Sequence, residues 1–225
     1  MSDTPQAILQ IAADLFQNNG YTQTTMTQIA DKSNIALTDL ETIYACKEYI
    51  VLDLDRSLAE EMQQSIVDLP DGQVARRYFQ TMETRIRQLQ PHYDAIAALL
   101  ATAMLPHSDI STKDISRGKQ DALYQAFLLL VQGSKDAPST ESDADNLAML
   151  LYTFHFMILL FWVYDRTKQK QATHLMIDFM GDFFKVLRPM MMMPMFRRAM
   201  TKLAKIMMLV FGGARLIDDE EFPQA

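Results

Sequence analysis

The chain of 225 residues has an ordinary globular composition, with 49% apolar and 22% charged residues, and it is long enough for one large or two small domains. Its seven glycines are too few and too scattered for a phosphate-binding loop or for the turns of an all-β fold, so we expect an all-α protein. The single cysteine, Cys46, excludes an internal disulfide, and the N-terminus shows no secretory signal, which predicts a cytoplasmic protein.

The net charge of -7 is concentrated at the N-terminal end of the chain. Residues 1–66 hold ten acids and three bases, whereas residues 67–225 hold 18 of each. A nucleic-acid-binding module normally carries a basic surface, because neutralising phosphates supplies most of the non-specific affinity. The sign of the charge on residues 1–66 is opposite to that expectation.

A first amphipathic helix is predicted between Thr4-Pro5, a typical helix start, and Asn18-Asn19-Gly20, a typical stop. The hydroxyls of Thr24-Thr25 offer a cap for a short second helix. This helix is predicted to end near Asn34, because asparagine tolerates the left-handed turn conformation.

A third short helix is marked by Leu37, Leu40, Ile43 and Tyr44, and a longer helix runs from Lys47 to about residue 66. Two short helices joined by a tight turn, with one helix before and one after, are typical of a helix-turn-helix unit.

The rest of the chain predicts longer helices separated by prolines and glycines. The predicted ranges are 73–90, 92–104, 113–132, 141–165, 171–187 and 195–211. This pattern indicates three parts: a helix-turn-helix domain at 1–47, a larger helical domain at 48–188 and a C-terminal amphipathic extension at 189–225.

Residues 147–164 form an uncharged apolar run of the shortest length that spans a membrane. Thr153 and His155 interrupt it, and acids precede it, so the interpretation as a helix buried in a core and at a dimer seam is favoured.

The N-terminal segment resembles the TetR family of bacterial transcriptional regulators. The resemblance rests on Ala12-x-x-Leu15-Phe16, Gly20-Tyr21, the segment 24–30 (TTMTQIA), Leu40 and Lys47-Glu48, which together cover about the first quarter of the chain. It implies an all-helical homodimer with a small DNA-binding domain and a larger domain that holds a ligand pocket and a two-helix dimer face, here at about 141–165 and 171–187.

The departures from the family pattern lie where DNA is touched. Thr42 stands in place of the usual phosphate-binding tyrosine, Ile43 in place of a histidine, and Cys46 in place of a capping serine. Asp39 and Glu41 bring acids to the recognition helix. Carboxylates there accept hydrogen bonds from cytosine but repel phosphates. The candidate DNA-contacting residues are Thr25, Thr27, Leu37, Thr38, Asp39, Thr42, Tyr44 and Lys47.

Aromatic residues on the central helices predict an apolar ligand site with one polar group, His155. The candidate lining residues are Met104, Tyr124, Phe127, Phe154, His155, Phe161 and Trp162. For any one of them, an ordinary position in the core or at the dimer seam is the favoured interpretation, and only as a set do they indicate a hydrophobic ligand.

No metal-binding or catalytic motif is found, so neither an enzyme nor a cofactor is predicted. His174 and Asp178 share a helix face, which favours a surface hydrogen-bonding pair over a metal site.

The segment 195–211 is basic on one face and apolar on the other, with Arg197, Arg198, Lys202 and Lys205 within an arc of about 140°. A helix of this kind docks on a membrane surface, on a partner, or on its own dimer.

Three hypotheses follow. The first is a TetR-like regulator that binds operator DNA as a homodimer and responds to a hydrophobic small molecule. The second is a protein of the same fold that does not read DNA, binds a lipid or isoprenoid, and contacts a membrane through residues 195–211. The third is an acidic module that binds a basic protein partner.

Overall fold

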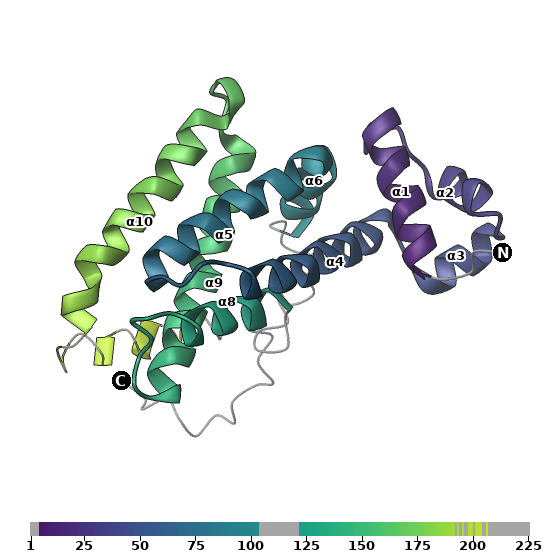
Figure 1. Cartoon of the computed structure of the whole chain (residues 1–225). Coiled ribbons are helices and arrows are strands. Elements are labelled where there is room, and N and C mark those ends of the chain that lie inside the picture. The colour runs from purple at the N-terminus through teal and green to yellow at the C-terminus, as the bar shows by residue number, and fades with distance from the viewer. Residues whose placement is uncertain are drawn as a thin grey trace, which may run out of the picture.

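The computed structural model of the protein describes residues 5–103 and 122–191, with the positions 193, 195, 198, 199, 201–203 and 206 beyond them. In these ranges the chain forms helices and no strand, so the predicted all-α class is confirmed (Figure 1). The order is α1 (Pro5–Asn19), α2 (Met26–Ser33), α3 (Leu37–Ile43), α4 (Lys47–Val67), α5 (Val74–Leu89), η1 (Gln90–His92), α6 (Tyr93–Ala103), α8 (Ala122–Gln132), α9 (Glu141–Tyr164), η3 (Lys168–Lys170) and α10 (Gln171–Met191).

The turn between α2 and α3 is built by local side-chain chemistry. The Thr25 hydroxyl accepts from the backbone N–H of Gln28, and the Gln28 side chain accepts in return from the N–H of Thr25, which is a complete capping box. Asn34 ends α2 with φ of 57°, in the left-handed region. The helix-turn-helix predicted from the sequence is therefore present.

The three N-terminal helices share a small core. Ile8 and Phe16 from α1, Ile29 from α2 and Leu40 from α3 are buried together with Tyr44. The core is apolar even though the surface is acidic, because the acids occupy exposed positions.

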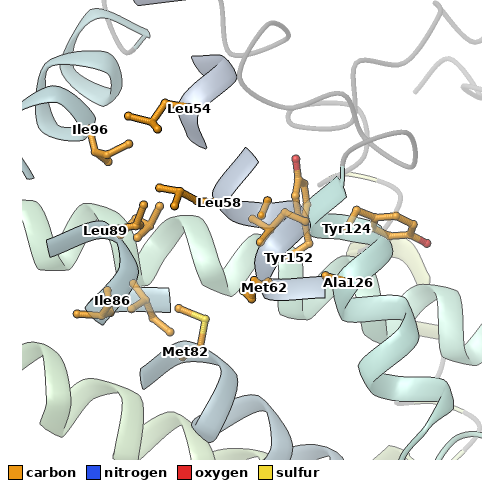
Figure 2. Close-up of a cluster of buried hydrophobic side chains, with 14 of the residues drawn as sticks. Leu54, Leu58, Met62, Met82, Ile86, Leu89, Ile96, Tyr124, Ala126 and Tyr152 are labelled. Atoms are coloured by element: carbon orange, nitrogen blue, oxygen red, sulfur yellow. The ribbon is translucent and has the colours of Figure 1, made fainter. Parts of the chain in front are cut away.

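Helix α4 connects this unit to the rest of the molecule (Figure 1). Its C-terminal part lies inside the larger domain, where Leu54, Leu58 and Met62 are buried. Figure 2 shows these three side chains among residues of α5 and α6 on one side, such as Leu89, and of α8 on the other, such as Ala126. A displacement of α4 relative to the larger domain would therefore move the helix-turn-helix unit with it.

Helices α9 and α10 form an antiparallel pair joined by a tight corner. The carboxylate of Asp165 accepts four hydrogen bonds there, from the N–H and hydroxyl of Thr167 and of Thr173. The Lys170 ammonium donates to the carbonyls of Trp162 and Asp165 and lies 4.2 Å from the ring centroid of Tyr93. This corner fixes the direction of α10 relative to α9.

Among the described residues, α9 is a helix long and apolar enough to cross a membrane by length and composition. However, 56% of its most apolar window is buried inside the protein, which agrees with the predicted core helix.

Helix α10 continues to Met191, past Pro189, so the predicted stop at residue 187 was wrong. A proline removes one backbone N–H, and this close to a C-terminus it costs a single hydrogen bond in the last turns. The proposed domain boundary after residue 188 lies in this final part of α10, whereas the boundary after residue 47 lies at the first residue of α4. The predicted helix start at residue 113 and the predicted helix end at residue 211 lie outside the described residues.

Candidate functional site

The exposed face of α3 is acidic and hydroxylated. Thr38, Asp39, Glu41 and Thr42 are all exposed, and Leu37 is half-buried against the core. The Thr42 hydroxyl donates to the backbone carbonyl of Thr38, 2.8 Å away, within the helix itself. In α2, Thr27 is exposed, and Thr25 is exposed with its oxygen used as the helix cap.

Two other candidate DNA contacts are turned inward. Tyr44 is buried, and burial together with the charge of Asp53 and a hydrogen bond to it raises the pKa of its phenol to about 12. Lys47 donates to the carbonyls of Tyr21 at 2.9 Å and Thr24 at 2.7 Å, and its ammonium lies 4.4 Å from the Tyr21 ring centroid. The half-buried Lys47 ammonium is therefore held against the loop that precedes α2.

The same loop is fixed to α4 by a second contact. The Tyr21 hydroxyl donates to the Glu48 carboxylate at 2.7 Å. Burial first, and then this hydrogen bond and the charge of Glu48, raise the pKa of Tyr21 well above its ordinary value. Tyr21, Lys47 and Glu48 thus attach the helix-turn-helix unit to the first turn of α4.

The larger domain contains a buried polar centre that the sequence reasoning found only in part. His155 of α9 is 1% exposed, and its ring lies 5.9 Å from that of Phe127 in α8. Trp162, two turns along α9, is also buried, with its ring 4.9 Å from that of Tyr93. Burial, and then the positive charge of Arg85, hold the pKa of His155 well below its ordinary value, so the imidazole is neutral near pH 7.

Arg85 of α5 is the residue that was missed. Its side chain is 0% exposed and forms an ion pair with Asp55 of α4. The sequence does hold a signal, because Arg85 falls between Met82 and Ile86 on the buried face of an amphipathic helix. A charged residue on such a face needs a partner or a ligand.

The remaining candidate ligand residues are spread over more than one surface. Tyr124 is buried and its hydroxyl donates to Asp145, while Phe154 is half-buried with its ring 5.5 Å from that of Phe184. Phe161 lies on an exposed face of α9, and Met104 lies outside the described residues. The structure therefore brings Phe127 and His155 together, and it places buried Trp162 two turns along α9, against Tyr93.

A search for similar structures finds the crystal structure of Thermus thermophilus FadR, a TetR family transcriptional repressor, in complex with lauroyl-CoA. The match has a TM-score of 0.57 at 16% sequence identity and covers 79% of this chain and 93% of that one. The protein has the TetR fold. No protein family model matches the chain, and no curated protein matches it.

His174 of α10 makes its contact with α5. Nδ1 of His174 lies 3.0 and 2.9 Å from the two carboxylate oxygens of Glu83 in α5, so the partner found is Glu83 and not the predicted Asp178. No group of three or more possible metal ligands occurs in the part of the chain that the structure describes.

In the C-terminal segment, Arg198 and Lys202 are exposed, whereas Arg197 and Lys205 lie outside the described residues. The Asn146 amide of α9 donates to the Thr201 hydroxyl at 3.2 Å, a contact between this segment and its own larger domain.

Proposed function

We propose that this protein is a ligand-responsive transcriptional regulator that binds operator DNA as a homodimer and is released or retained by a hydrophobic small molecule. The observation that carries the proposal is the intact helix-turn-helix, with its Thr25 cap and Asn34 turn, in a protein of the TetR fold. Helix α4 joins this unit to the larger domain, where Asp55 of α4 pairs with the buried Arg85. In a helix-turn-helix protein the second helix, here α3, enters the major groove.

An exposed apolar stripe on α9 and α10 supports dimerisation through a second copy of the chain. It consists of Met157, Phe161, Tyr164, Leu175, Phe179, Phe183 and Val186, which recur at three- and four-residue spacing along each helix. Two copies would pack these helices into a four-helix bundle and bury the stripe. A two-fold axis would also place two α3 helices in successive major grooves.

The chemistry of the buried region supports an amphipathic effector. The aromatic rings of Phe127 and Trp162 provide apolar surface, and His155 and Arg85 provide polar groups. The similar repressor was solved with lauroyl-CoA, which combines an acyl chain with an anionic group. An effector that favours one position of α4 would change the spacing of the two recognition helices.

The decisive experiment is fluorescence anisotropy with duplex DNA from the regions flanking the coding sequence. A regulator is expected to bind at 50 mM salt and to weaken steeply, by about tenfold or more, at 200 mM. Absence of binding at low salt would overturn the proposed function.

A second candidate function is that of a TetR-fold protein that binds lipid, does not read DNA, and contacts a membrane through residues 195–211. It is supported by the acidic α3 surface and by Lys47, whose ammonium donates to the carbonyls of Tyr21 and Thr24. It predicts flotation of the purified protein with anionic liposomes and a loss of flotation in Arg198→Glu/Lys202→Glu. Equal flotation of the two proteins would contradict it.

Neutralising the acids of α3 is expected to strengthen binding to non-specific DNA by about tenfold, because Asp39 and Glu41 are exposed and each repels nearby phosphates. The variant is Asp39→Asn/Glu41→Gln, and anisotropy at low salt measures the affinity. The control removes two exposed acids from α4 and α9, Glu60→Gln/Glu141→Gln. Weaker binding by the α3 variant would mean that the acids contact bases.

A further inference from the structure

In the part of the chain that the structure describes, six side chains of α5 and α9 carry buried polar atoms without a hydrogen-bond partner, and four of these side chains are almost completely buried. In Arg85 these atoms are Nε and one terminal nitrogen, in His155 both ring nitrogens, in Trp162 the indole nitrogen, and in Thr81 the hydroxyl oxygen. Each of these residues is 2% exposed or less. We call these four residues the Arg85 centre.

The residues of the Arg85 centre lie on two helices that pack against each other. Thr81 and Arg85 lie one turn apart on α5, and His155 and Trp162 lie two turns apart on α9, so each pair shares a helix face. Helix α5 packs against α9, and the charge of Arg85 adds to burial in lowering the pKa of His155, which places Arg85 near His155. Arg85 and His155 therefore lie at the middle of this group, with Thr81 one turn from Arg85 on α5 and Trp162 two turns from His155 on α9.

The unpaired atoms in this centre are mainly hydrogen-bond donors. Arginine and tryptophan nitrogens only donate, a neutral imidazole has one donor, and a threonine hydroxyl donates or accepts. Gln88, near Arg85 on α5, adds one unpaired acceptor. A buried unsatisfied group costs about 1–3 kcal/mol, and more when it is charged, so a cluster of this size is stabilised by an acceptor that binds there.

Asp55 shows which acceptor suits Arg85. Its carboxylate already binds one terminal nitrogen of the guanidinium and leaves the other two nitrogens unused. A second carboxylate would accept hydrogen bonds from these two nitrogens and would bury one negative charge. A phosphate dianion would bury two negative charges.

The surroundings of the centre are apolar. The ring of Phe127 lies beside His155, and the ring of Tyr93 lies beside Trp162. Along α5, Arg85 is flanked by the buried residues Met82, Ile86 and Leu89. Figure 2 shows Leu89 of α5 beside Leu58 of α4. A ligand that brings an acceptor here therefore has an apolar remainder.

We propose that Arg85 and His155 bind the carboxylate of a monocarboxylic acid with an apolar chain, and that this acid is the effector of the regulator. The assignment rests on the proposed function for its regulatory role, whereas the binding itself stands on the Arg85 centre alone. The ligand carboxylate competes with Asp55 of α4 for the same guanidinium, so binding weakens a contact that holds α4 in the larger domain.

The test compares dodecanoate, dodecan-1-ol and dodecyl phosphate, which share one chain and differ in the head group. Binding to the full-length protein is measured by calorimetry and by the fluorescence of Trp162, the single tryptophan of the chain. Dodecanoate is expected to bind at least tenfold more tightly than the alcohol and more tightly than the phosphate. Equal affinities for acid and alcohol would overturn the proposal, and tighter binding of the phosphate would overturn the carboxylate assignment.

Three variants locate the binding site. Arg85→Gln is expected to abolish the preference for acid over alcohol while the alcohol still binds, and His155→Phe to reduce this preference severalfold. Asp55→Asn is expected to strengthen dodecanoate binding, because it removes the competing carboxylate. The control Arg76→Gln removes an exposed arginine from the same helix and is expected to change nothing.

A preference that persists in Arg85→Gln would overturn the site. If Arg85→Gln fails to fold, the wild-type comparison and Asp55→Asn still decide, because unchanged or weaker dodecanoate binding in Asp55→Asn contradicts the competition. If the proposed function is wrong, the protein will not bind DNA but will still bind dodecanoate more tightly than dodecan-1-ol. DNA binding without any acid preference would remove this inference alone.

Discussion

Replacing Asp165 with alanine is expected to destabilise the protein by about 3 kcal/mol and to lower its melting temperature by about 6 to 12 °C. The carboxylate accepts four hydrogen bonds of 2.6 to 2.8 Å from Thr167 and Thr173, and Thr173 is fully buried. Alanine leaves the N–H and hydroxyl of Thr173 without their acceptor. Calorimetry or thermal circular dichroism measures the change, with the exposed Asp31→Ala as the matched control.

The same carboxylate predicts a dependence of stability on pH. Burial alone would raise the pKa of Asp165, but the hydrogen bonds from Thr167 and Thr173 outweigh it and hold the pKa well below its ordinary value. A depressed folded-state pKa contributes stability that is fully present above the unfolded pKa of about 3.9 and is lost as the pH falls below it.

The difference in free energy of unfolding between wild type and Asp165→Ala is therefore expected to shrink between about pH 5 and pH 3. Urea unfolding at several pH values measures it. A constant difference over this range would mean that the carboxylate does not act through its charge.

Sequence reasoning predicted the features that local chemistry determines. The Thr25 cap, the Asn34 turn and the start of α4 at Lys47 each depend on residues within one helical turn, and the structure shows all three. Pro189 was read by the same local rule, but a helix near its C-terminus tolerates the loss of one backbone hydrogen bond.

Contacts between distant parts of the chain were not predictable. Lys47 matches a family position expected to face DNA, yet its carbonyl partners lie 23 and 26 residues away and draw it inward. Arg85 pairs with an aspartate 30 residues away and acts on a histidine 70 residues away, so neither relation is visible in one sequence. The apolar spacing on α5 indicates that Arg85 lies on the buried face. Only the packing of α4 and α9 against α5 shows which groups surround its charge.

Introducing glutamate at Leu175 and Phe179 is expected to convert a dimer into monomers and to lower DNA affinity by more than a hundredfold. These side chains are 63% and 59% exposed on α10, so their replacement disturbs little of the core. In the proposed dimer each would lose apolar burial worth about 1.5–3 kcal/mol and would place an unpaired carboxylate at the seam. Loss of the second DNA half-site removes an avidity gain of about 10² to 10⁴.

Light scattering measures the mass, and anisotropy measures DNA binding on the same samples. The control is Val67→Glu, which adds a charge at an exposed apolar position at the end of α4. A folded variant that remains dimeric would place the dimer interface on another face.

Figure 1 shows α10 at the side of the larger domain remote from α1, α2 and α3. The substitutions therefore leave the helix-turn-helix surface unchanged, and any loss of DNA affinity reports the separation of the subunits. A monomer that binds DNA as tightly as wild type would show that one α3 helix is sufficient, and would contradict recognition by a two-fold symmetric pair.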